Sequence, residues 1–164
     1  MTEHKLLASV IIPLIDHRDQ YMKSIKSFRD QTLENESYEI IVACLETAPE
    51  LDEITTAYPD VRIVFCDNYQ DHEMYNAAIA NSHGQYPYLT ECHCFAEPEC
   101  VEAAIQATKT QGVQCINSNS NNGNANRFGE MEQRLFDIDV VRWKESARSK
   151  ISVREFLIDR TTWD

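Results

Sequence analysis

Three cysteines and a histidine gather in one short stretch of the sequence, at Cys92, His93, Cys94 and Cys100. Thiols and imidazoles are good zinc ligands, but these spacings lack the usual Cys-x2-Cys pair, so a zinc site stays the weaker alternative. A nucleophilic Cys92–His93 pair is also disfavoured, because adjacent residues of an extended segment point apart. The same alternation predicts buried thiols at 92 and 94, opposite an exposed Glu91 and His93.

Acidic side chains dominate the middle of the chain. The net charge is −12, and residues 30–108 hold 16 acidic side chains but one basic residue, Arg62. Such a field repels phosphate backbones, which argues against a nucleic-acid partner. An anionic ligand on this surface would need a metal ion between the two. The plainer alternative is a solvated acidic surface.

The six cysteines are expected to be free thiols. The first residues, Met1 to Lys5, do not resemble a signal peptide, and no apolar run approaches the ~20 residues needed to cross a bilayer. We therefore expect a cytoplasmic protein without a transmembrane segment. The sequence leaves the oligomeric state open, a homo-oligomer included.

The elements that must position a site alternate between strand and helix. Apolar runs rich in β-branched residues predict strands at 6–13, 39–45, 61–66 and 86–89. Apolar residues at helical spacing predict helices at 19–31, 49–58, 72–83 (closed by Gly84 as its C-cap) and 99–108. This alternation is typical of a three-layer α/β sandwich with a mainly parallel central sheet.

The pattern weakens after Gly112. Short strands are expected at 113–116 and 151–158, a polar loop at 117–126, and only weak patterning at 129–143. We expect one domain over 1–164, with the binding part at about 6–110 and an irregular remainder at 111–164.

Ligands of open α/β sheets bind at the carboxyl ends of the strands. Here these ends are 13–16, 44–47, 66–71 and 90–97. The chain has four glycines, and none follows the first strand closely. A Rossmann dinucleotide site and a P-loop are therefore excluded.

A series of short blocks resembles the family 2 glycosyltransferases in order and spacing. The blocks are 9–13 (SVIIP), 38–42 (YEIIV), 58–64 (YPDVRIV), 75–80 (YNAAIA), 84–86 (GQY), 88–98 (YLTECHCFAEP) and, later, 154–158 (REFLI). The resemblance implies a glycosyltransferase-A fold. It also implies transfer of a sugar from a nucleotide-diphosphate donor, most simply a UDP-sugar, to an unknown acceptor.

The resemblance implies a nucleotide site as well. In the family the base is held by residues that follow the first strand, here Pro13, Leu14, Ile15 and Asp16. An acidic residue after the second strand holds uracil, and Glu46 is the nearest substitute because the usual Asp-Asp-Gly-Ser is missing. The family's Arg-Asn pair is Tyr75-Asn76 here, which keeps Asn76 as a nucleotide contact but removes the basic one.

The resemblance also implies a metal site after the fourth strand. The family's Asp-x-Asp is replaced by Glu91-Cys92-His93, and some branches of the family resemble Glu-Asp-His here. A carboxylate and an imidazole can hold Mn²⁺, whereas Mg²⁺ prefers oxygen ligands. Such an ion would offset the charge of the leaving nucleotide diphosphate. We expect Glu91 and His93 to turn towards solvent at the end of this strand.

No catalytic residue can be assigned from the sequence. The family's general base lies beyond the late strand, and the late carboxylates here, Asp159 and Asp164, match no family motif. The resemblance is thus to a divergent, C-terminally short member. The alternative function is a non-catalytic glycosyltransferase-like domain that binds a nucleotide, a sugar or a partner protein.

Overall fold

The computed structural model describes residues 6–16, 19–118, 123, 126–145 and 156–163. The chain divides into two compact units, one made of 1–118 and 153–164 and the other of 119–152. The first unit holds the sheet and every candidate site residue named above.

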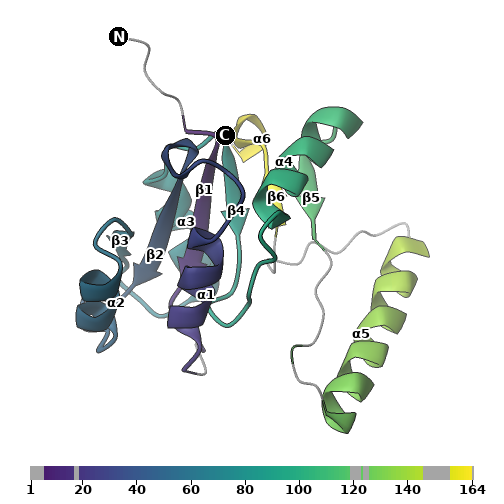
Figure 1. Ribbon diagram of the computed structural model, residues 1–164, viewed down its shortest axis with the longest axis horizontal. Helices are drawn as coiled ribbons and strands as arrows, with labels where there is room; N and C mark the ends of the chain where they lie inside the picture. The colour runs from purple at the N-terminus through teal and green to yellow at the C-terminus, as the bar shows by residue number, and fades with distance from the viewer. Residues whose placement is uncertain (1–5, 17–18, 119–122, 124–125, 146–155, 164) are drawn as a thin grey trace. The chain divides into compact units, whose positions relative to one another are not determined.

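A six-stranded sheet forms the centre of the first unit, in the order β3-β2-β1-β4-β6-β5 (Figure 1). Its strands are β1 (Ala8–Pro13), β2 (Tyr38–Cys44), β3 (Arg62–Phe65), β4 (Tyr86–Leu89), β5 (Cys115–Asn117) and β6 (Phe156–Ile158). The first four strands run parallel, β6 is antiparallel to β4, and β5 is antiparallel to β6. The predicted, mainly parallel sheet is confirmed.

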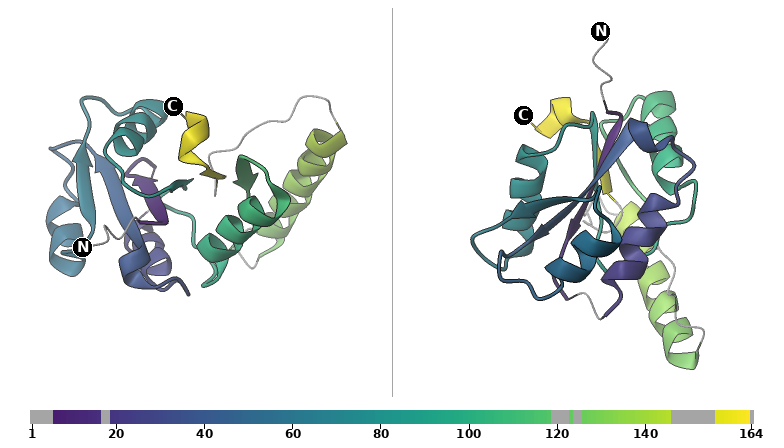
Figure 2. Two further views of the ribbon diagram at one scale, coloured as in Figure 1. Left: turned by 90° about the horizontal axis from the view of Figure 1, so that it is seen from above. Right: turned by 60° about the vertical axis from the view of Figure 1, so that its left-hand side comes forward.

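Helices cover both faces of this sheet, as the right-hand view of Figure 2 shows. On one face lie α1 (Tyr21–Arg29), α2 (Leu51–Ala57) and α4 (Cys100–Gln111), and on the other lies α3 (Asp71–Ala80). Strand β1 serves both cores, because side chains alternate along a strand. Val10 and Ile12 pack in the core under α1, while Ile11 packs in the core under α3.

The prediction that Gly84 caps α3 is wrong. The helix ends at Ala80 with Asn81 as its C-cap. Gly84 instead lies against the backbone of β1, where an added Cβ would fall 2.3 Å from the carbonyl carbon of Ala8. The glycine that does cap a helix is Gly112, which follows α4 in the left-handed conformation with φ of 62°.

The C-terminal part differs from the prediction in its elements. Strand β5 begins two residues later than expected, and residues 151–155 of the strand predicted at 151–158 lie outside the described residues. The weakly patterned segment forms a 19-residue helix, α5 (Arg127–Glu145), in the second unit. The chain ends in a short helix, α6 (Arg160–Trp163).

Among the described residues, no helix is both long enough and apolar enough to span a membrane.

Glu39 forms hydrogen bonds with three other segments of the chain at the amino end of the sheet. Its carboxylate accepts hydrogen bonds from the Ser9 hydroxyl at 2.7 Å, the His83 backbone N–H at 2.6 Å and the Arg62 guanidinium at 2.7 Å. Burial alone would raise the pKa of this carboxyl, but the three donors outweigh burial and hold the pKa below its usual 4.5.

The Glu39→Gln variant should therefore lose stability in a pH-dependent way. A folded-state pKa below the unfolded one stabilises the protein at neutral pH, and this contribution disappears as the pH falls through the folded-state pKa. We expect a loss of about 1–3 kcal/mol at pH 7, because hydrogen bonds to a charge are removed. Urea unfolding at pH 3 to 7 should show the two curves converging in acid. The exposed Glu36→Gln variant is the control, and equal losses in both variants would contradict this role of Glu39.

Candidate functional site

The segments that follow β1, β3 and β4 are joined by hydrogen bonds at one edge of the sheet. The Cys92 thiol donates to the carbonyl of Ile15 at 2.9 Å, which fastens the end of β4 to the end of β1. The backbone N–H of Asp16 lies 3.4 Å from the hydroxyl of Tyr69, between β3 and α3. The segments that follow these parallel strands therefore lie side by side, where ligands of this fold class bind.

The segment from Pro13 to Asp16 is only partly accessible. The side chains of Pro13 and Leu14 are buried, that of Ile15 is half-buried, and that of Asp16 is exposed. Asp16 has φ of 46°, in the left-handed region that non-glycine residues seldom occupy. Ile15 and Asp16 are thus the two residues here whose side chains reach the surface.

Glu46 and Asn76 are both exposed, and no hydrogen bond of the described residues joins their side chains to the rest of the site.

The neighbour of Asn76, Tyr75, is buried and donates from its hydroxyl to the carbonyl of Thr90 at 2.9 Å. Burial, and then the negative charge of Glu91, raises the pKa of Tyr75. A neutral phenol therefore stands where the resemblance predicts an arginine, and it supports the backbone next to Glu91.

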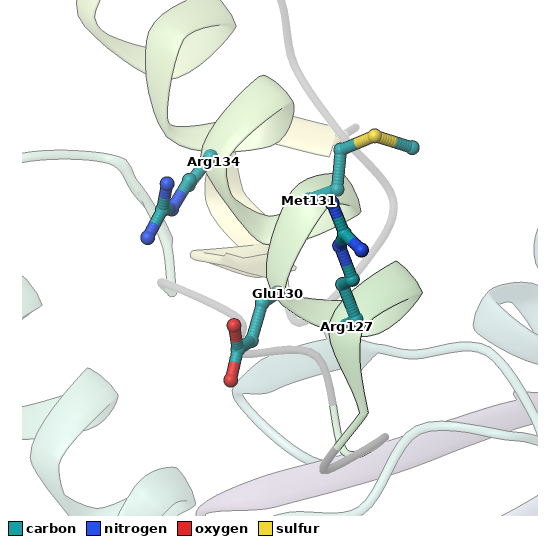
Figure 3. Close-up of a pocket in the computed structure, with 4 residues that line it drawn as sticks. All are labelled: Arg127, Glu130, Met131 and Arg134. Carbon is teal, nitrogen blue, oxygen red and sulfur yellow. The ribbon is translucent and has the colours of Figure 1, made fainter.

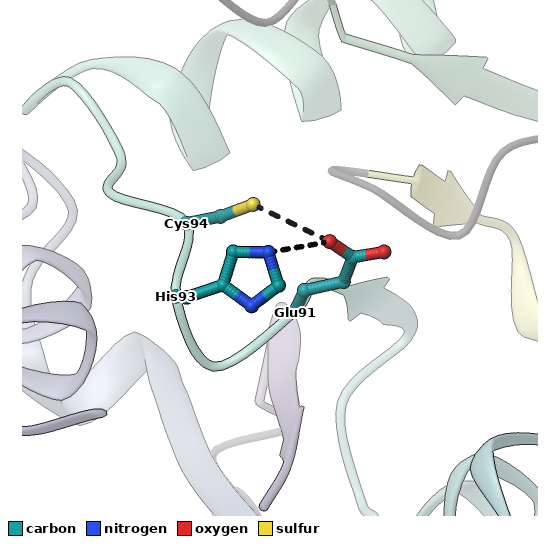
Figure 4. A group of neighbouring side chains, drawn as sticks. All are labelled: Glu91, His93 and Cys94. Atoms are coloured by element: carbon teal, nitrogen blue, oxygen red, sulfur yellow. Dashed lines mark hydrogen bonds and ion pairs between the residues drawn. The ribbon is translucent and has the colours of Figure 1, made fainter. Parts of the chain in front are cut away.

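Three side chains of different chemistry meet just after β4, as Figure 4 shows. The Nε2 atom of His93 lies 3.2 Å from Oε2 of Glu91, and the Cys94 thiol lies 4.0 Å from the same oxygen. The ligand atoms of the three residues all lie within 4.8 Å of one another. A single cation can therefore contact a carboxylate oxygen, an imidazole nitrogen and a sulfur at this point.

A tight turn produces this cluster. Strand β4 ends at Leu89, and the backbone N–H of Cys94 bonds the carbonyl of Glu91 at 3.0 Å. The turn brings residue 94 to the side of residue 91, whereas an extended segment would have placed it opposite. The expectation of a buried Cys94 beside an exposed Glu91 and His93 is wrong, since all three are half-buried.

The thiols of Cys92 and Cys100 contact other residues, away from this cluster. Cys92 is fully buried against Ile15, and burial raises its pKa to about 12, so the thiol stays protonated at neutral pH. The sulfur of Cys100 lies 3.0 Å from the hydroxyl of Tyr88. Within the described part of the chain, Cys94 is the one cysteine that joins His93 in a metal-ligating group. The zinc arrangement of Cys92, His93, Cys94 and Cys100 considered from the sequence therefore does not form, and burial of Cys92 disfavours it as a nucleophile.

The cluster passes a simple test of fit for a divalent cation. Glu91 and His93 are only 24% and 15% exposed, so an ion bound between them would be partly shielded from water. The buried Nδ1 atom of His93 has no hydrogen-bond partner in the parts of the chain that the structure describes. The ring contacts Glu91 through its other nitrogen, Nε2, so this nitrogen and the carboxylate are close enough to share an ion.

The late carboxylate Asp159 lies at the opposite end of the sheet. Strand β6 is antiparallel to β4 and pairs Phe156 with Leu89 and Leu157 with Tyr88. The residue after β6 therefore lies at the amino end of β4, away from Glu91. There the Asp159 carboxylate accepts hydrogen bonds from the backbone N–H and hydroxyl of Thr161 at 3.0 and 2.8 Å. It starts α6 and is no general base for this site, while Asp164 lies outside the described residues.

A hollow on α5 offers no comparable chemistry. It is lined by Arg127, Glu130, Met131 and Arg134, which all come from the same helix (Figure 3). All four side chains are exposed, and one helix cannot enclose a ligand. The hollow is therefore an open surface of the second unit.

Comparison with known proteins identifies the family. Residues 9–160 match the family described as Glycosyl transferase family 2. The chain belongs to this family. The match covers the six strands, apart from Ala8 at the start of β1, and the Glu91–His93–Cys94 cluster, so the family predicted from the short sequence blocks is confirmed. No curated protein has a significantly similar sequence.

Solved structures of glycosyltransferases share the fold. The mannosyltransferase PcManGT from Pyrobaculum calidifontis, in complex with GDP-Man and Mn²⁺, is 11% identical with a TM-score of 0.70, over 94% of this chain and 44% of that one. Glucosyl-3-phosphoglycerate synthase from Mycobacterium tuberculosis, in complex with UDP, is 16% identical with a TM-score of 0.66, over 95% and 57%. TarS residues 1–349 from S. aureus, solved with UDP-GlcNAc, are 14% identical with a TM-score of 0.61, over 74% and 37%.

These neighbours establish the glycosyltransferase-A fold for this family 2 chain. The chain spans between 37% and 57% of the length of the three solved proteins, so their activities do not pass to it directly.

Proposed function

We propose that this family 2 chain is a glycosyltransferase domain that uses a nucleotide-sugar donor, with its donor site within about residues 6–110. The observation that carries the proposal is the half-buried Glu91–His93 pair, held beside the segment of Ile15 and Asp16 by the Cys92–Ile15 hydrogen bond. This arrangement supports a cation site next to the segment proposed to hold the base.

The nucleotide would lie along the carboxyl ends of β1 and β2. Ile15 and Asp16 offer accessible side chains to a base, and Pro13 and Leu14 shape the backbone beneath them. The exposed Glu46 carboxylate would accept a hydrogen bond from a uracil N–H, and Asn76 would contact the nucleotide from α3. A UDP-sugar is the donor we favour, in line with the UDP and UDP-GlcNAc bound by two of the solved neighbours.

Glu91 and His93 would hold a divalent cation at the donor diphosphate. A bound cation neutralises the negative charge that the nucleotide diphosphate gains when the glycosidic bond breaks. Within residues 30–108, all of which the structure describes, the one basic side chain is Arg62, which bonds Glu39 at the amino end of the sheet, and Tyr75 is neutral. Since the pair includes an imidazole, Mn²⁺ fits it better than Mg²⁺.

Titration calorimetry tests the proposal. UDP should bind the full chain in the presence of Mn²⁺ and bind at least tenfold more weakly without a metal, while ADP should bind poorly under both conditions. UDP-GlcNAc should release UDP slowly in the metal-containing sample. Equal binding with and without a metal would contradict the role of the cation.

The non-catalytic alternative is favoured by one observation, the position of Asp159 far from Glu91. UDP binding without any release of UDP from the sugar donor would support a nucleotide-binding domain. The absence of binding to any nucleotide or sugar would support a partner-protein role.

A further inference from the structure

We propose that Cys94 is a third metal ligand of this chain and that the site therefore selects a thiophilic divalent ion, Zn²⁺ or Co²⁺, over Mn²⁺. The inference rests on the proposed function for the position of the ion beside a donor, but binding of the ion itself needs no nucleotide. The starting observation is that the sulfur of Cys94 and the imidazole of His93 approach the same carboxylate oxygen of Glu91, at 4.0 and 3.2 Å (Figure 4).

The donor set determines the preferred ion. Carboxylate and water ligands suit Mn²⁺ and Mg²⁺, whereas thiolate and imidazole ligands suit Zn²⁺. Affinity for nitrogen and sulfur donors also rises from Mn²⁺ through Co²⁺ in the general order of divalent metals. One carboxylate, one imidazole and one thiolate make three protein ligands, which leaves the fourth position of a tetrahedral zinc ion open. An open position is what a diphosphate oxygen would need.

Cys94 is the cysteine of this stretch that is placed to be a ligand. Cys92 is fully buried and donates to a backbone carbonyl, and the Cys100 sulfur lies against Tyr88. Cys94 is half-buried, and the turn that bonds its N–H to the carbonyl of Glu91 fixes its position relative to the carboxylate.

The charge balance also favours a cation. A cation bound here would offset the negative charges of a Cys94 thiolate and of the neighbouring Glu91 carboxylate. Binding of the ion forms a metal–sulfur bond, and the Cys94 thiol proton leaves to solvent. The reaction releases one proton from sulfur per ion and involves no oxidation or reduction.

Cobalt absorption spectroscopy of the full chain, without any nucleotide, tests the inference. Titration with Co²⁺ should produce a thiolate-to-cobalt charge-transfer band in the near ultraviolet. One equivalent of Zn²⁺ should abolish the band, whereas a large excess of Mn²⁺ should leave it. The Cys94→Ser variant should lack the band and bind Zn²⁺ at least about 10–100-fold more weakly, a loss typical even of residues that only support a ligand. The Cys115→Ser variant, which changes an exposed thiol on β5, should keep the band.

Thermal melting shows whether the Cys94→Ser variant is folded. A folded variant that lacks the cobalt band supports ligation by Cys94. A band that persists in Cys94→Ser, or displacement of Co²⁺ by Mn²⁺, would overturn the inference. A different result would contradict the proposed function alone. Stoichiometric Zn²⁺ binding that does not change UDP affinity would reject the donor site but leave the metal site. Conversely, Mn²⁺-dependent UDP binding by a chain that shows no thiolate-to-cobalt band would reject the sulfur ligand and leave the donor site.

Discussion

The Gly84→Ala variant should be less stable than the wild-type chain by about 3 kcal/mol or more. The added Cβ would fall 2.3 Å from the carbonyl carbon of Ala8, 2.5 Å from the nitrogen of Ser9 and 2.7 Å from the oxygen of Ala8. All three atoms belong to the backbone of β1, which pairs with β2 on one side and β4 on the other. No flexible side chain can move away, so the cost should reach or exceed the 1–3 kcal/mol usual for overpacking.

Hydrogen bonds at Gly84 would be strained by the same change. Its N–H donates to the Ser9 hydroxyl at 2.8 Å, and its carbonyl accepts from the Arg160 guanidinium at 2.9 Å. Movement of residue 84 away from β1 would therefore also loosen the C-terminal segment. Against a total stability of about 5–15 kcal/mol, the loss should be plain in urea unfolding and in the melting temperature.

Two other glycines serve as controls. An added Cβ meets nothing within 4 Å at Gly112 or Gly123. Gly112→Ala should cost about 1–2 kcal/mol, because alanine disfavours its left-handed backbone. Gly123→Ala should change stability by no more than about 0.5 kcal/mol. If Gly84→Ala matched Gly123→Ala, the close approach of Gly84 to β1 would be wrong.

The sheet was predictable because several consecutive apolar residues in each strand indicate the same buried strand. Val10, Ile11 and Ile12 are apolar in succession, which indicates a strand buried on both faces, and the structure places them alternately in the two cores. The helices on either side repeat their apolar residues at the period that such faces require. The predictions of fold and family therefore rest on many residues that indicate the same elements. A wrong interpretation of one residue does not change either prediction.

The site was less predictable because the positions of its side chains depend on single turns of the backbone. Placement of Cys94 depends on where β4 ends, and no glycine or proline near residue 91 marks that turn. Local sequence predicts a helix cap at Gly84, but the role of this residue depends on its contact with Ala8, which lies 76 positions earlier. Likewise, Asp159 follows a late strand, and only the antiparallel pairing of that strand shows that it lies far from Glu91.

Replacement of either Glu91 or His93 by alanine should abolish the metal dependence of UDP binding. With saturating metal, the affinity of each variant should fall to the value that the wild-type chain shows without metal, a loss of at least tenfold, or about 1.4 kcal/mol. The reason is that, in the proposed site, the two side chains share one ion, and their ligand atoms lie 3.2 Å apart. The Glu97→Ala variant removes an exposed carboxylate from the same loop and should bind UDP as the wild type does.

The stability of these variants separates a ligand role from a structural one. Both side chains are half-buried, whereas the sequence predicts exposed ones, so a small cost is expected, about 1 kcal/mol, for the lost contact between the two side chains and the lost packing of the ring. The double variant should bind UDP no more weakly than either single variant, because each change already removes the shared ion and the two effects do not add. Calorimetry and thermal melting of the four proteins give both quantities. A large drop in melting temperature for His93→Ala with unchanged metal-dependent binding would mean that His93 supports the turn after β4 and holds no ion.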